Sequence, residues 1–196
     1  MSIEALYYGV AVINVLIGLI AAGILLTSAT KPPFWDGVKK HLHTYGMKYA
    51  WVVATLATLG SLFLSEIAGI PPCPLCWWQR IFMYPLPIML GVAIMQKSAL
   101  TARLTGIIMA VTGGLIAGYH FLLQRANFWI AGETNTAQNV LITVFETIGL
   151  SLTAPGCAVN QSCSAMYLGY WGFYSIPVMA FVSFFTIAVL LFYTKK

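Results

Sequence analysis

The chain has 196 residues, of which 60% are hydrophobic and only 8% are charged, and its mean hydropathy is +0.84. Soluble globular proteins carry about 25% charged residues, so this composition excludes a water-soluble enzyme, and its apolar character excludes a disordered chain. Because a helix that crosses a bilayer needs about 20 residues, the length allows four or five spanning helices and one long loop. The sequence therefore predicts an integral membrane protein.

Five apolar runs are long enough to cross a membrane. None shows the alternating polarity of β-barrel strands, so the runs predict an all-α membrane fold. Pro85 and Pro87 in the third run, and Pro177 in the fifth, remove backbone donors and are expected to bend the helices. The first run lacks the positive flank of a signal peptide and is too long for one, so it is expected to be retained. The runs cover residues 3–27, 49–70, 81–95, 104–123 and 172–192.

The basic residues predict the orientation of these helices. If five runs span, only Arg80 and Arg125 lie on the side of the N-terminus. Basic residues favour the cytoplasmic side, so the N-terminus is expected outside and the C-terminus in the cytoplasm. The net charge of +5 follows from this topology and calls for no nucleic-acid partner. The basic residues on the predicted cytoplasmic side are Lys31, Lys39, Lys40, Lys48, Lys97, Arg103, Lys195 and Lys196.

All four cysteines are then expected on the outside. Cys73 and Cys76 form a Cys-Pro-Leu-Cys motif between the second and third runs, and Cys157 and Cys163 lie in the long loop before the fifth. An even number of cysteines in an oxidising compartment indicates disulfides. Three pairings are possible, and proximity in the sequence favours 73–76 and 157–163.

The spacing of the first pair favours thiol–disulfide exchange. A Cys-x-x-Cys disulfide closes so short a loop that it stabilises a fold little, whereas redox-active dithiols use this ring size. Two inert disulfides are one alternative. A zinc site of four thiolates is another, but the wider second spacing and the oxidising compartment speak against it, so no metal is expected.

A redox dithiol in a membrane needs an electron acceptor. The motif lacks the histidine that c-type haem attachment requires, and the chain has no Rossmann glycine motif, which leaves a lipid-soluble quinone. It is expected beside the interfacial Trp77 and Trp78. Arg80 lies one helical turn after Cys76, where it can stabilise a thiolate or polarise a quinone oxygen; the alternative is an arginine that extends to the lipid headgroups.

The run from Cys73 to Arg80, CPLCWWQR, with the IFMYPLP that follows it, resembles the signature of the DsbB/BdbC family. These are quinone-linked disulfide oxidoreductases of the bacterial envelope. The close second cysteine pair and the GFYSIP sequence at 172–177 are similar to the BdbC branch. The resemblance covers about residues 47–194 and implies a four-helix redox domain over 47–196. Residues 1–46 are then an additional N-terminal transmembrane helix with its cytoplasmic connection.

The resemblance also implies a role for each cysteine pair. Cys73 and Cys76 correspond to the pair next to the quinone, with Cys76 as the thiolate that meets it. Cys157 and Cys163 correspond to the pair that takes electrons from a thioredoxin-fold thiol oxidase of the DsbA/BdbD kind. The implied function is to reoxidise that partner and pass the electrons to menaquinone or ubiquinone in the bacterial cell membrane, which sustains disulfide bond formation.

Arg80 corresponds to the quinone-site arginine of the family, and His120 is similar to a family histidine at the outer end of its helix; a solvated interfacial histidine is the alternative. Glu66, near the outer end of the second run, is a candidate proton carrier or a hydrated carboxylate. Apolar residues at helical spacing over 140–148 predict a short amphipathic helix in the outer loop.

Two other functions remain as alternatives. A vitamin K epoxide reductase-like enzyme also connects two thiol pairs to a quinone, but its Cys-x-x-Cys follows the other pair in sequence. A membrane scaffold with structural disulfides is the non-enzymatic alternative.

Overall fold

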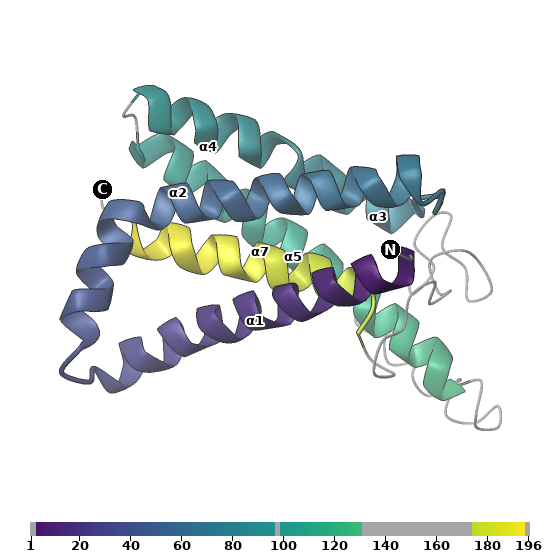
Figure 1. Ribbon diagram of the computed structural model, residues 1–196, viewed down its shortest axis with the longest axis horizontal. Coiled ribbons are helices and arrows are strands. Elements are labelled where there is room, and N and C mark those ends of the chain that lie inside the picture. Colours follow the sequence, from purple (N-terminus) through teal and green to yellow (C-terminus); the bar gives the residue numbers. More distant parts are fainter. Residues whose placement is uncertain (1–2, 97–98, 131–173, 195–196) are drawn as a thin grey trace, which may run out of the picture.

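A computed structural model describes residues 3–96, 99–130 and 174–194 of the chain. The described part consists of helices joined by short connections (Figure 1). In chain order these are α1 (Ile3–Thr30), α2 (Trp35–Leu62), the π-helix η1 (Phe63–Ile67), α3 (Pro74–Met83), α4 (Pro85–Gln96), α5 (Ala99–Ile130) and α7 (Ile176–Tyr193).

Five helical segments are long and apolar enough to cross a membrane, which confirms the predicted all-α membrane fold. Two of them are composite: η1 continues α2, and α3 and α4 form one span that is interrupted at Tyr84. The interruption lies immediately before Pro85, as expected from the missing backbone donors of the two prolines. The amphipathic helix expected over 140–148 lies outside the described residues. The five segments are Tyr7–Thr30, Trp35–Ile67, Pro74–Gln96, Leu100–Arg125 and Ile176–Tyr193.

The start of the second helix was predicted wrongly. Pro32 and Pro33 follow the end of α1, and Lys31 there has a positive φ of 46°, so the chain reverses within a few residues. α2 then begins at Trp35 instead of near residue 49. The predicted cytoplasmic connection is therefore mostly helical, because polar helix formers such as Lys39 and Lys40 extend a helix beyond its apolar part. These first turns run across the end of the bundle before α2 turns along it (Figure 1).

The third span also begins earlier than predicted, at Pro74 instead of near residue 81. Cys73 is the N-cap of α3, and Pro74 occupies its first turn. Proline is well suited to this position because its missing N–H would have no partner there and its φ is already helical. The Cys-Pro-Leu-Cys motif is therefore the first turn of a helix and not part of a loop.

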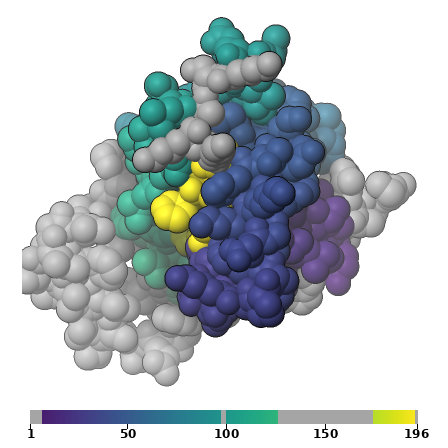
Figure 2. All heavy atoms as spheres, turned by 90° about the vertical axis from the view of Figure 1, so that its left-hand side faces the viewer, coloured from purple at the N-terminus to yellow at the C-terminus, as the bar shows by residue number. Residues whose placement is uncertain are grey.

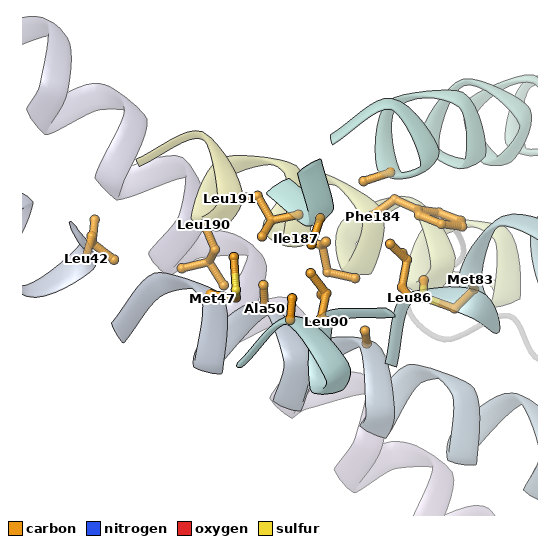
Figure 3. Packing of buried hydrophobic residues seen from close by; sticks show 14 of the residues in the cluster. Leu42, Met47, Ala50, Met83, Leu86, Leu90, Phe184, Ile187, Leu190 and Leu191 are labelled. Carbon is orange, nitrogen blue, oxygen red and sulfur yellow. The ribbon is translucent and has the colours of Figure 1, made fainter. Parts of the chain in front are cut away.

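The core of the bundle forms around α7, which packs against α1, α2 and α5. Figure 2 shows the C-terminal end of α7, in yellow, between α2 and α5. Glycines let α5 and α2 approach α7 closely. A side chain on Gly106 of α5 would collide with Leu191, and one on Gly46 of α2 would collide with Thr194. Figure 3 shows the core side chains from α2, α3, α4 and α7, among them Leu42, Met47, Met83, Leu86, Leu90, Phe184, Ile187 and Leu191.

Candidate functional site

Cys73 and Cys76 face each other in the first turn of α3. Their Sγ atoms lie 2.8 Å apart, and the backbone N–H of Cys76 donates a hydrogen bond of 3.2 Å to Cys73 Sγ. Cys73 is almost completely buried, whereas Cys76 is partly exposed. At the N-cap position, the Cys73 sulfur accepts a hydrogen bond from a backbone N–H of the first turn. This donor favours negative charge on the sulfur.

His120 of α5 reaches the same sulfur. Its Nε2 lies 3.8 Å from Cys73 Sγ, and its Nδ1 lies 3.0 Å from the side-chain Nε2 of Gln79. Because an amide NH₂ only donates, Nδ1 is the acceptor, and the ring proton of neutral His120 is on Nε2, next to Cys73. Gln79 therefore orients His120 as a hydrogen-bond donor to the thiolate. All three side chains are buried.

These contacts lower the pKa of Cys73 from 9.0 to about 4. The hydrogen bond from the Cys76 side chain is the largest cause, and a hydrogen bond from His120 also contributes, while burial opposes the shift. In the fully reduced pair the negative charge thus lies on Cys73. Cys76, the thiolate expected from the family resemblance, can carry the charge when Cys73 is bonded to another sulfur.

Arg80 points into the bundle from the second turn of α3. Its Nε donates to Ser61 Oγ and its Nη2 to the Ser61 carbonyl oxygen, both at 3.0 Å. The guanidinium also lies over the rings of Trp77 and Tyr84, at 5.3 and 5.8 Å from their centres. With only 9% of its surface exposed, Arg80 does not extend to the headgroups, which was the alternative considered from the sequence.

The π-helix η1 begins two residues after Ser61. Here the N–H of Ala68 donates to the carbonyl oxygen of Phe63, five residues earlier, instead of the usual four. Such wider turns are frequent at functional sites. In this chain the wider turns lie close to Ser61, which holds Arg80.

A cavity of about 760 Å³ brings these residues together. Its lining is largely apolar, with a few polar groups at the end where α2 stops and α3 begins. Ligand sites commonly have this composition. Glu66 also lies on the wall of the cavity, whereas Cys157 and Cys163 lie outside the described residues. The candidate site residues that line the cavity are Cys73, Cys76, Arg80 and His120, together with Gln79 and Ser61.

Several polar residues of this cavity had no predicted role. Gln79 and Ser61 were missed because their roles depend on contacts between helices that are distant in sequence. The same is true of Gln124, whose side-chain oxygen accepts a hydrogen bond of 2.8 Å from Ser175, and of Asn14 in α1. The available signal was their position: each is a polar residue inside an otherwise apolar run, where it needs a partner.

Cys73, Cys76 and His120 also form the kind of ligand set that soft metals prefer. Their ligand atoms all lie within 4.8 Å of one another. They supply three of the four ligands of a tetrahedral zinc site, and the four-thiolate site considered from the sequence would require two cysteines outside the described residues.

Comparisons with known proteins place the chain among proteins of disulfide bond formation. The sequence model of the family described as "Disulfide bond formation protein DsbB" matches residues 46–194. A "Probable disulfide formation protein" of Oceanobacillus iheyensis is 39% identical over 140 residues, which are 71% of this chain and 81% of that protein. "Disulfide bond formation protein C" of Bacillus subtilis is 35% identical over 140 residues, 71% of this chain and 85% of that protein.

A third relative, "Probable disulfide formation protein C 1" of Bacillus anthracis, is 34% identical over 153 residues, 78% of this chain and 93% of that protein. No solved structure matches the chain. The family match includes the Cys-Pro-Leu-Cys motif, Arg80 and His120, and it leaves α1 outside. The chain therefore belongs to the DsbB family of membrane proteins for disulfide bond formation.

Proposed function

We propose that this protein reoxidises an extracytoplasmic thioredoxin-fold thiol oxidase of the DsbA/BdbD type and passes the electrons to a membrane quinone. The observation that carries the proposal is the shared cavity: a paired dithiol, a buried arginine and a buried histidine line one apolar space next to the end of the bundle. A quinone, menaquinone or ubiquinone, supplies the acceptor for two electrons and two protons.

The cysteines transfer the electrons by two successive exchanges. A partner thiolate attacks the Cys157–Cys163 disulfide, and the partner leaves oxidised once its second thiolate displaces the mixed disulfide. A thiolate of the reduced Cys157/Cys163 pair then attacks Cys73 Sγ of the Cys73–Cys76 disulfide, and Cys76 leaves as a thiolate in the cavity. When the second thiol of that pair displaces Cys73, the Cys157–Cys163 disulfide re-forms and both electrons remain on Cys73 and Cys76.

The surrounding side chains stabilise the charges that these steps create. His120 donates its Nε2 proton toward Cys73, and Gln79 keeps that proton in place. Two of the five guanidinium N–H groups of Arg80 donate to Ser61, and these bonds hold the cation in a fixed position in the cavity wall. Other N–H groups of the guanidinium can contact a quinone oxygen or the Cys76 thiolate.

The first prediction tests the order of electron transfer. With a reduced thioredoxin-fold donor and a quinone, the purified protein should produce quinol and oxidised donor in equal amounts. Cys76→Ser should abolish quinone reduction but still oxidise one equivalent of donor through Cys157 and Cys163. In Cys163→Ser, Cys157 can attack the Cys73–Cys76 disulfide, and the thiolate of a donor with a single cysteine then displaces Cys73. This variant should therefore accumulate a donor bonded to Cys157, which mass spectrometry of non-reduced peptides identifies. A donor trapped mainly on Cys73 would contradict the proposed order.

The second prediction concerns the Cys73 thiolate. In a reduced variant that lacks Cys157 and Cys163, the ultraviolet absorbance of the thiolate should persist down to about pH 5, since the pKa of Cys73 is about 4. His120→Ala should move the titration to higher pH because the anion loses a donor. His41→Ala, on the other side of the bundle, is the control. A native titration midpoint near 9, or no shift in His120→Ala, would refute this role of His120.

The third prediction concerns Arg80. Lysine cannot reproduce the planar pair of hydrogen bonds to Ser61, so Arg80→Lys should keep exchange with the partner but raise the KM for quinone. A charge-assisted hydrogen bond contributes about 1.5–3 kcal/mol, which corresponds to roughly a ten- to hundredfold change. Arg103→Lys is a matched control, because Arg103 donates to the carbonyl oxygens of Leu191 and Phe192 instead. An unchanged KM would remove Arg80 from the quinone site.

The fourth prediction tests the proposed orientation, with the N-terminus and the cysteines outside and the C-terminus in the cytoplasm. In a variant without native cysteines, Pro71→Cys should react with an impermeant thiol reagent in intact cells. Lys40→Cys should react only after the membrane is permeabilised. Both positions are exposed, so accessibility within the protein does not confuse the result. The reverse labelling pattern would invert the topology.

A further inference from the structure

Helix α1 lies outside the part of the chain that the family matches, yet it forms one wall of the redox cavity. The lining residues fall at intervals of three and four along α1, so they occupy a single face of the helix. That face extends for about 15 Å along the helix axis, at 1.5 Å for each residue. The α1 residues of the wall are Tyr7, Val10, Ile13, Asn14 and Ile17.

Polar contacts fix the position of α1. They join α1 to α7 and to Tyr174, which lies two residues before the start of α7. The side-chain amide of Asn14 donates to Ser183 Oγ at 3.1 Å and lies 3.4 Å from the carbonyl oxygen of Met179. The hydroxyl of Tyr174 donates to Asn14 Oδ1 at 2.6 Å. One helical turn further, Gly18 lies so close to Val182 that a side chain at residue 18 would collide with it. These contacts hold α1 against α7 and so fix which face of α1 lines the cavity.

Helix α2 forms the opposite wall, and its lining residues also share one face of the helix. These residues are Val53, Leu56, Ala57 and Gly60. α1 packs against α7 and has no comparable contact with α2 in the described part of the chain. Figure 1 shows α7 between the two helices. We call the apolar space bounded by α1, α2 and α7 the α1–α2 groove. It is continuous with the space that contains Cys76 and Arg80.

We propose that the α1–α2 groove binds the isoprenoid tail of the quinone, and that the lining face of α1 determines how strongly tailed quinones bind. The inference rests on the proposed function, which places the quinone ring at Cys76 and Arg80. Three observations favour a tail as the occupant. The groove opens from the ring site, its walls are apolar, and its one α1 amide, Asn14, is already satisfied by protein partners.

Apolar side chains on both walls are available for such a chain. Ile13 on α1 and Leu56 on α2 are 57% and 58% exposed, although both line the groove. Inside a bilayer the hydrophobic effect contributes little, but close van der Waals packing of a chain against these side chains is favourable. Lipid acyl chains could cover the same surface, so the test must be made where lipid is always present.

The experiment compares two quinones that have the same ring, one with a long isoprenoid tail and one without a tail. Binding to the full-length protein in lipid nanodiscs is measured from the rise in Tm with quinone concentration. Ile13→Trp narrows the groove and should weaken binding of the tailed quinone about tenfold or more while the tailless quinone binds as before. Leu16→Trp is the matched control, since Leu16 is 54% exposed and lies on α1 outside the lining.

A second variant tests the groove from the α2 side. A Cβ atom added at Gly60 would have no atom of another residue within 4 Å. We therefore expect Gly60→Leu to fold normally and to place its side chain in the groove. Gly23→Leu, also without neighbours and outside the lining, is its control. We expect the same selective loss of tailed-quinone binding in Gly60→Leu and none in Gly23→Leu.

The outcomes separate the two proposals. Unchanged binding of the tailed quinone in Ile13→Trp and Gly60→Leu, or an equal loss for both quinones, would refute the tail site. Equal affinity of the native protein for both quinones would also refute it, since lipid then competes successfully with the tail, and the proposed function would stand. If the native protein binds neither quinone, the proposed function itself is refuted.

Discussion

Cys73 has hydrogen-bond partners from two helices, α3 and α5, and the packing of these two helices beside each other brings the partners to the sulfur. Cys76 contributes its backbone N–H and its thiol from the same helical turn, and His120 approaches from α5. A buried anion in an apolar bundle is costly unless donors surround it. The donor from α5 is present only if α5 packs beside α3, and its proton faces the sulfur only if Gln79 occupies Nδ1. The packing of α3 against α5 and the charge on Cys73 therefore depend on the same contacts.

The Arg80 guanidinium is also buried inside the bundle, so it needs hydrogen-bond acceptors there. Ser61 supplies a hydroxyl and a backbone carbonyl from the end of α2, and the Trp77 and Tyr84 rings cover the cation. The Tyr84 hydroxyl also lies 3.3 Å from Ser61 Oγ. The positive charge is thus fixed at the cavity wall by groups from α2 and α3, close to the cysteine pair that acquires negative charge when reduced.

Much of the fold could be predicted from the sequence because it depends on local patterns. Apolar length predicted the five spans, and the prolines predicted a bend in the third span, where the helix is interrupted at Tyr84. The helix starts at Trp35 and Pro74 were missed for one reason: hydropathy identifies the part of a helix that suits lipid, whereas capping and helix propensity decide where the helix begins.

The partners inside the site could not be derived in the same way. Gln79 stands next to Arg80 in the motif, but its contact with His120 depends on how α3 and α5 are rotated about their axes, which hydropathy does not specify. The contacts of Ser61 and Asn14 could not be predicted for the same reason. The family resemblance singled out Arg80 and His120 as candidates from the motif and from helix position, while the side chains that contact them could be recognised only from the packing.

The π-helix at the end of α2 has a consequence for how the length of this chain can vary. A wider turn accommodates one more residue than an α-helical turn over the same rise. The residues before it, which pack against α7, and the residues after it, which lead to Cys73, can therefore both keep the register of a regular helix. Loss of one residue between Phe63 and Ile67 would be absorbed by a return to regular helix, and the chain would then leave α2 in nearly the same direction as now. A one-residue insertion or deletion elsewhere in α2 would instead rotate the connection to Cys73 by about 100° around the helix axis. The end of α2 is therefore the place where this span can change by one residue with little effect on the cysteine motif.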